Sequence, residues 1–242
     1  MKAAICSLIY FFILQVTVAQ TSMNAISTGN GKIELVSPSA LGTQTPEGID
    51  YSNISGSPFW SADWNMALLF LSENSAVKKN KVKLNFFTGE VHYMDEAGQE
   101  LAAQTGLVKK IIFFDNKDTS KIAAVFQTFT DINKKTVYNT EIEQPFCQVL
   151  NIGKVELLKL TLVTQRQAVN VPLGKTVYSF HSNESYYLVK DNIVSPLKNL
   201  NKENILTPLT STPAVEEWLT ANKNKLKNEK DVINFLAFYN GN

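Results

Sequence analysis

Between residues 64 and 195, short runs of alternating apolar and polar residues recur about every ten positions and are separated by turn residues. Such spacing is typical of antiparallel strands joined in a meander, because βαβ units would insert helical repeats between the strands. The pattern predicts roughly ten strands. An open curved sheet, a sandwich and a partial barrel all satisfy it.

The clearest hairpin spans residues 82–94. Residues 82–87 and 90–94 both read as strands, and Thr88-Gly89 stands between them. Glycine accepts the positive φ that a tight hairpin turn needs. We therefore expect a hairpin with a two-residue loop at this place.

The pattern changes to helical spacing after residue 197. Thr212 followed by a proline predicts a helix N-terminus, and Asn228 with Asp231 resembles a capping box at the start of a second helix. Helices this short are marginal alone, so their apolar sides must pack on the sheet. The predicted fold class is mainly β, or α+β: an antiparallel meander sheet with two amphipathic C-terminal helices, the helical part covering about residues 202–240.

The amino-terminal end predicts export. Lys2, an apolar run over residues 3–14 and small residues up to Ala19 form the pattern of a secretory signal, here residues 1–19. The run is too short for a transmembrane anchor, and none is expected in the mature chain. Residues 20–56, rich in Ser, Thr, Gly, Asn and Pro, read as a loosely ordered leader with one strand at residues 32–36. Residues 57–242 then form a single β-rich domain with a helical end.

Charge and cysteine content exclude several classes of function. The formal net charge is +1, and Lys2 is the only charged residue of the signal, so the rest of the chain is about neutral. Arg166 is the only arginine, which makes binding of nucleic acid or of phosphorylated ligands a poor fit. Cys147 is left alone once the signal is removed, so no internal disulfide is expected, and it reads as a small buried hydrophobe.

Motifs for metals, cofactors and nucleophilic catalysis are missing from the sequence, and no metal or cofactor is expected. Of the two histidines, His92 lies in a predicted strand and is expected to be half exposed; a zinc site that also uses His181 is the alternative. Glu141 and Glu143 share one strand face and are the weak candidates for an acid/base pair.

One stretch has binding character. Phe59, Trp60 and Trp64 fall close together with Asp63 between them. Aromatic rings with a carboxylate are typical of sugar-binding surfaces, where ring faces stack on the sugar and the acid accepts its hydroxyl groups. The alternative is that these rings attach the first strand to the core.

Several segments resemble small exported proteins of Bacteroidota that have no known activity. The likeness is carried by residues 57–60 and 63–64, the hairpin at 82–93, the strand and turn at 186–191, and the tail at 225–233 with Phe238-Tyr239-Asn240. The resemblance implies export and a β-meander followed by a helical pair. It implies no activity.

Three functional hypotheses follow. The first is a non-enzymatic envelope protein, in the periplasm, at the outer membrane or outside the cell, that binds a protein, glycan or lipid partner. The second is a secreted hydrolase of glycosidase type that uses carboxylates such as Glu141 and Glu143, which predicts an acidic pair in a cleft. The third is an adhesin with Trp60 and Trp64 in one exposed patch.

Overall fold

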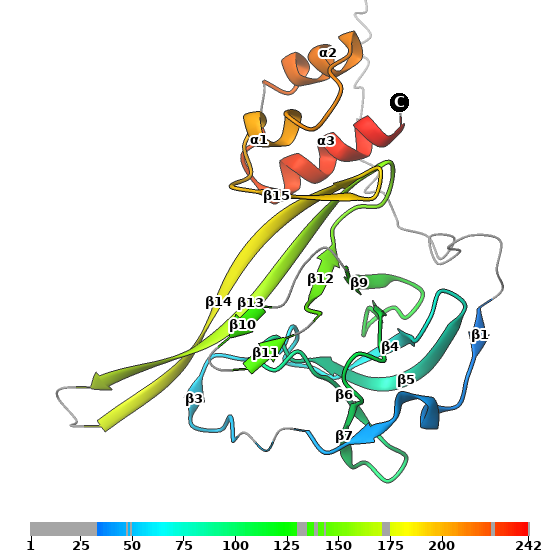
Figure 1. Cartoon of the computed structure of the whole chain (residues 1–242), viewed down its shortest axis with the longest axis vertical. Coiled ribbons are helices and arrows are strands. Elements are labelled where there is room, and N and C mark those ends of the chain that lie inside the picture. Colours follow the sequence, from blue (N-terminus) through cyan, green and yellow to red (C-terminus); the bar gives the residue numbers. More distant parts are fainter. Residues whose placement is uncertain are drawn as a thin grey trace, which may run out of the picture.

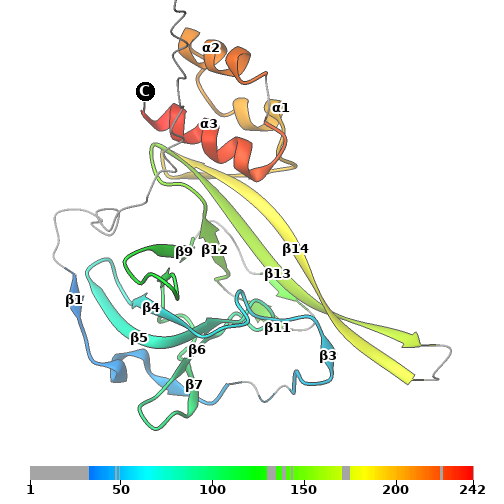
Figure 2. The same ribbon diagram turned by 180° about the vertical axis from the view of Figure 1, so that it is seen from behind.

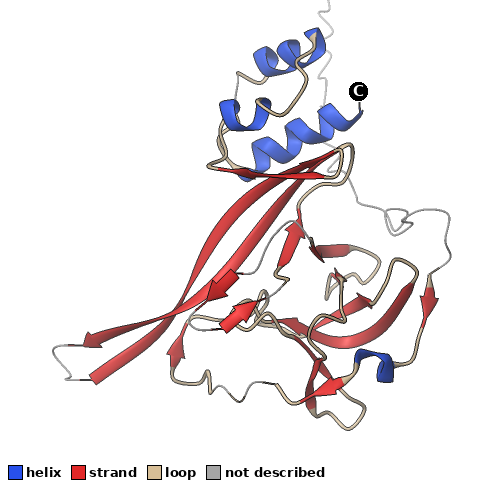
Figure 3. Ribbon diagram, in the orientation of Figure 1, coloured by secondary structure: helices blue, strands red, loops and turns tan. Residues whose placement is uncertain are grey.

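The computed structural model describes residues 33–46, 48, 50–129, 135–137, 140–142, 144–170, 175–223 and 226–241. Within them the chain forms one open mixed sheet of 13 strands, a separate two-stranded sheet and three α-helices near the C-terminus (Figures 1 and 3). The predicted mainly β fold class is confirmed. The predicted signal, residues 1–19, and residues 20–32 of the predicted leader lie outside the described residues.

The main sheet is assembled from two meanders joined at β4. Its strand order is β15-β14-β13-β12-β9-β8-β4-β5-β6-β7-β2, with β1 beside β5 and β3 beside β14. The strands of the main path are β2 (Thr43–Gln44), β4 (Asn65–Phe70), β5 (Ser75–Leu84), β6 (Val91–Met94), β7 (Glu100–Ala103), β8 (Lys110–Phe114), β9 (Ile122–Thr128), β12 (Phe146–Val149), β13 (Val155–Asn170), β14 (Lys175–Lys190) and β15 (Ile193–Leu197). Along this path all neighbours are antiparallel, as the alternating pattern predicts.

The sheet curls back on itself. The backbone N–H of Val163, in β13, donates to the carbonyl of Phe86, just beyond β5, at 3.3 Å, although four strands separate β13 from β5 in the sheet order. The concave side is filled by side chains, with Phe113 and Phe126 among the largest that are fully buried. The buried members of this core are Leu41, Ala67, Leu69, Val77, Val82, Leu84, Val91, Tyr93, Ala103, Val108, Ile111, Phe113, Ala124, Phe126 and Phe146.

The hairpin between β5 and β6 has a longer loop than predicted. Asn85 and Glu90 still face each other, with the Asn85 N–H donating to the Glu90 carbonyl at 2.9 Å, so the loop is residues 86–89. The buried Asn85 side chain stabilises this wider loop, because its Oδ1 accepts hydrogen bonds from the N–H groups of Phe87 and Thr88. Gly89 has a φ of 79°, which suits glycine.

Residues 33–56 contribute strands to the sheet. β1 (Glu34–Leu35) lies within the one strand predicted here and pairs parallel with β5, and β2 pairs with β7. A short 3₁₀ helix (Pro38–Leu41) lies between β1 and β2. β3 (Ile54–Ser55) pairs parallel with β14. The segment therefore pairs with the sheet at three places, β5, β7 and β14.

The C-terminal unit has three helices where the sequence predicts two. α1 (Lys202–Leu206) is the additional helix, too short to show a clear apolar repeat. The Thr212 hydroxyl caps α2 (Pro213–Ala221), and Asn228 with Asp231 forms the predicted capping interaction before α3 (Glu229–Gly241). The helices pack on the inner ends of β13 and β14 through a shared core of Val155, Leu157, Leu188, Ile205, Val215, Leu219, Leu226, Val232, Phe235 and Leu236.

The Asn240 side chain bonds the end of α3 to the sheet. The Asn240 Oδ1 accepts a hydrogen bond from the Val155 N–H at 2.9 Å, and its Nδ2 donates to the Val155 carbonyl at 2.8 Å. The carboxamide thus pairs with both backbone groups of a fully buried strand residue, as a neighbouring strand would. Gly153 makes room for it, since a Cβ there would collide with the Asn240 carboxamide.

β13 and β14 pair over their whole length, with Val155 opposite Lys190 and Asn170 opposite Lys175. Their inner ends lie under the helices, and their outer ends run past the rest of the sheet (Figures 1 and 2). Among the described residues, none of the helices has the length and hydropathy needed to span a bilayer.

Candidate functional site

The β5–β6 side of the sheet carries a hollow of about 380 Å³. Its described lining comes from four stretches of chain: residues 46–51, residues 59–64, β5, and residues 92–100. We call it the aromatic hollow, and its lining residues are Pro46, Gly48, Tyr51, Phe59, Trp64, Lys83, His92, Met94 and Glu100. Because these stretches are joined by the sheet rather than by sequence, the hollow could not be read from any one motif.

Two aromatic rings and a lysine form one wall of the hollow. The Lys83 Nζ lies 5.0 Å from the centroid of the Phe59 ring and 5.0 Å from that of Trp64. Such cation–π contacts hold a lysine against the rings while its remaining donors stay available. The Phe59 ring also meets the His92 ring edge-on, with centroids 5.5 Å apart. This wall therefore combines flat apolar surface with a hydrogen-bond donor.

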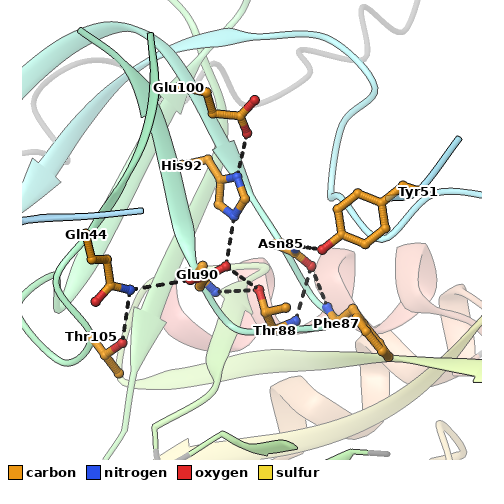
Figure 4. Close-up of polar contacts among 9 residues, drawn as sticks. All are labelled: Gln44, Tyr51, Asn85, Phe87, Thr88, Glu90, His92, Glu100 and Thr105. Atoms are coloured by element: carbon orange, nitrogen blue, oxygen red, sulfur yellow. Dashed lines mark hydrogen bonds and ion pairs between the residues drawn. The ribbon is translucent and has the colours of Figure 1, made fainter. Parts of the chain in front are cut away.

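His92 lies at the floor between two carboxylates (Figure 4). Its Nδ1 is 2.6 Å from the Glu100 Oε1 and its Nε2 is 3.2 Å from the Glu90 Oε2. Only 2% of His92 is exposed, so the expectation of a half-exposed histidine is wrong. Strand alternation cannot show the cover that the Phe59 ring and the neighbouring strand β7 give to His92.

The carboxylates favour the protonated form of His92. Burial lowers the pKa of His92, but the hydrogen bonds and charges of Glu90 and Glu100 outweigh it, and the pKa lies above its ordinary value. With both ring nitrogens engaged, the imidazolium satisfies both acids at once. The imidazole is therefore held in place and is a poor candidate for a general base.

Glu90 connects the aromatic hollow to a second one. Its Oε2 accepts a hydrogen bond from the Thr88 hydroxyl at 3.1 Å, and its Oε1 accepts one from the Gln44 Nε2 at 3.4 Å (Figure 4). Glu90 also lines a hollow of about 260 Å³ bounded by the β5–β6 loop, residues 103–109 and β12. The Glu90–His92 pair is thus a polar partition between two depressions.

Tyr51 ties the segment before the sheet to the site. Its hydroxyl accepts a hydrogen bond from the Asn85 Nδ2 at 2.9 Å, and its ring meets Phe59 edge-on with centroids 5.8 Å apart. It also meets Phe180, in β14, at 5.7 Å. One tyrosine therefore links the hollow, the β5–β6 loop and the long hairpin.

The four residues predicted for ligand binding are divided by the structure. Phe59 and Trp64 line the hollow. Trp60 stacks on Phe113 with centroids 4.6 Å apart and packs against the main core. Asp63 is exposed in a turn, where its N–H donates to the Ser61 hydroxyl. The alternation of neighbouring residues in an extended segment explains why adjacent rings point to different environments.

The described residues do not show the predicted carboxylate pair, Glu141 and Glu143, as a site. Glu141 lies in β11 (Thr140–Ile142), which pairs with β10 (Lys135–Val137), and its side chain is outside what the structure describes. Glu143 lies outside the described residues. The acidic residue that the structure does place in the hollow, Glu100, was missed because its role depends on the pairing of β6 with β7. Lys83 and Tyr51 were missed because Lys83 is placed by the β5–β6 pairing, opposite His92, and Tyr51 by its contacts with Asn85 and Phe59.

Among the described residues, no group of three or more His, Cys, Asp or Glu side chains has a geometry that could hold a metal ion. Cys147 is buried in β12, as expected for a small hydrophobe.

Comparison of the chain with protein-family models, with curated proteins and with solved structures finds no match in any of the three.

Proposed function

We propose that the protein is a non-enzymatic binding protein and that the aromatic hollow binds a saccharide. The observation that carries the proposal is the convergence of Phe59 and Trp64 with Lys83 and Glu100 in one depression. Sugar rings present an apolar face and a rim of hydroxyl groups. Aromatic rings match the face, while a lysine and a carboxylate match the rim as donor and acceptor.

The arrangement of acids supports binding rather than hydrolysis. Glycosidases need two carboxyl groups that face the scissile bond. In the described lining of the aromatic hollow the acid is Glu100, and its Oε1 is bonded to His92. Glu90 lies on the other side of the imidazole and faces the second hollow. The hydrolase hypothesis therefore gains no support from this site.

The exported envelope location belongs to the same proposal. It rests on the signal-like residues 1–19, which end at small residues. Mass spectrometry of the protein purified from a secretion-competent bacterium tests it: the proposal requires a chain that starts near Gln20 in the periplasmic or extracellular fraction. A cytosolic chain that begins at Met1 contradicts it.

Saccharide binding is tested with soluble tetrasaccharides of glucose, mannose and N-acetylglucosamine, titrated by calorimetry and tryptophan fluorescence. We expect at least one to bind and to change the emission of Trp64. Trp64→Ala should weaken binding by about tenfold or more, as for a central aromatic contact. Trp218→Phe is the matched control, because Trp218 packs on Phe235 in the helical unit.

Absence of binding by every sugar, or equal affinity of Trp64→Ala and the wild type, would refute the site. Circular dichroism of each variant separates loss of binding from loss of folding.

A further inference from the structure

The outer half of the long hairpin, residues 163–170 and 175–182, is a separate feature that we call the arm. The inner half of the hairpin, residues 155–162 and 183–190, pairs with β12 and β15 and lies under the helices. Along the arm, β3 is the described strand that pairs with β14, and it does so only at Tyr178 and Ser179. The β13 side of the arm has no paired strand among the described residues besides β14. The arm projects beyond the sheet in both views (Figures 1 and 2).

Apolar side chains on the arm are exposed to solvent. Val169 is 66% exposed, Val177 is 45% exposed and Tyr178 is 39% exposed. Val169 and Thr176 are paired across the hairpin. A two-stranded ribbon without a further neighbour is marginally stable in water, and exposed edges of this kind are usually guarded by lysine, proline or bulges. The β13 half of the arm, residues 163–170, contains no lysine, proline or bulge, and Arg166 is the one charged side chain on it.

The direction of the free backbone groups follows from one hydrogen bond. The Val163 N–H donates to the Phe86 carbonyl, which lies on the side of β13 away from β14. Backbone groups of a strand alternate in direction, so the N–H and C=O groups of Gln165, Gln167 and Val169 also point away from β14. The outward N–H and C=O groups of these three residues can therefore form ladder hydrogen bonds with an added strand.

The structure already contains one addition of this kind. β3 pairs parallel with the β14 side of the arm, with Ile54 opposite Tyr178. This strand belongs to the segment before the first meander. Strand addition supplies affinity through main-chain hydrogen bonds, and side chains of alternate residues supply specificity.

The charge of the arm favours an acidic partner strand. The sequence from residue 163 to residue 182 contains no aspartate or glutamate, and Arg166 is exposed on it. A second copy would bring two arms of the same charge together, which opposes pairing. A strand that carries carboxylates would instead face Arg166 with opposite charge.

We propose that the arm docks an extended acidic segment of a partner protein, which adds as a strand to the β13 edge at Gln165, Gln167 and Val169. This goes beyond saccharide binding and uses a different surface, so either proposal can fail alone.

The test uses fluorescent peptides of about eight residues, the length of a typical strand, that alternate valine with glutamate. A matched peptide alternates valine with lysine. Fluorescence anisotropy with the full-length protein should show binding of the acidic peptide and markedly weaker binding of the basic one. Arg166→Glu should reverse this preference.

A backbone variant separates strand addition from side-chain contact. Gln167→Pro removes an outward N–H, which edge strands tolerate, and should weaken binding of the acidic peptide by about tenfold. Gln167→Ala keeps the N–H and should bind as the wild type does. Hydrogen exchange should show slower exchange of the Gln165, Gln167 and Val169 amides when the acidic peptide is bound.

Three outcomes would overturn the proposal. One is no binding of the acidic peptide, or binding that Gln167→Pro leaves unchanged. Another is a dimer in light scattering that Gln167→Pro dissolves, which would assign the edge to a second copy. The third is protection of the same amides by phosphatidylglycerol vesicles but not by the acidic peptide, which would assign the arm to a membrane surface.

Discussion

Replacing Asn240 with alanine should loosen the helical unit from the sheet. The carboxamide of Asn240 satisfies the Val155 N–H at 2.9 Å and shares the Val155 carbonyl with the Asn151 Nδ2, which donates to it at 2.9 Å. In Asn240→Ala the Val155 carbonyl keeps its hydrogen bond from Asn151, whereas the buried Val155 N–H loses the Asn240 Oδ1 as its acceptor. An unsatisfied buried N–H costs about 1–3 kcal/mol, and the second lost hydrogen bond adds about 0.5–1.5 kcal/mol.

We therefore expect the free energy of unfolding to fall by about 2–3 kcal/mol, allowing for partial access of water to Val155 in the variant. Urea titration followed by circular dichroism and by tryptophan fluorescence measures it. Asn234→Ala is the matched control, because Asn234 is exposed on the same helix and its replacement should change stability by no more than about 0.5 kcal/mol.

The reasoning is refuted if Asn240→Ala and Asn234→Ala have the same unfolding free energy within about 0.5 kcal/mol. In that case the Asn240–Val155 hydrogen bonds would contribute nothing that water does not replace.

Three further predictions concern the site and the core. The pKa of His92 is raised in the folded protein, so its ion pairs with Glu90 and Glu100 stabilise the fold fully below the unfolded value of about 6.5, and this contribution is lost as the pH rises through the higher folded pKa. The stability difference between wild type and His92→Gln, measured by urea titration, should therefore shrink as the pH rises above about 6.5. A difference that grows with pH would contradict this. Gly89→Ala should lower the melting temperature, because the residue has a positive φ and its Cβ would lie 2.9 Å from the Ile142 Cγ2; an unchanged melting temperature in differential scanning calorimetry would show that the loop adapts freely. Trp60→Ala should destabilise the protein by about 3–5 kcal/mol, as expected for a large aromatic ring packed in a core, whereas Trp64→Ala should cost far less in the same urea titration; equal losses would show that Trp60 is not part of the core.

The sequence indicated correctly the features that depend on neighbouring residues. The capping of α2 by Thr212 and of α3 by Asn228 follows from local hydrogen bonds, and the structure has both. The β5–β6 hairpin was also predicted, although its loop is longer because the Asn85 side chain stabilises a wider turn. Local chemistry fixes such features within a few residues of chain.

Features that depend on distant pairing could not be predicted. The alternation of β4 shows that it is a strand, but not that β8 lies beside it; the same holds for β3 and β14. The aromatic hollow contains residues of both kinds, those suggested by the local sequence and those placed by distant pairing. Phe59 and Trp64 were proposed from composition, whereas Glu100 enters only through the β6–β7 pairing, and Trp60 could be assigned to the core only once Phe113 was placed.

The position of β4 has a consequence for the order of folding. Its partner β5 follows after a short turn, while its other partner, β8, is separated from it by β5, β6 and β7. The first meander can close early, leaving the second edge of β4 open until residues 110–114 arrive. Non-local pairing of this kind is slow, and an open apolar edge is prone to association during the delay. Refolding from denaturant should therefore give yields that fall as the protein concentration rises.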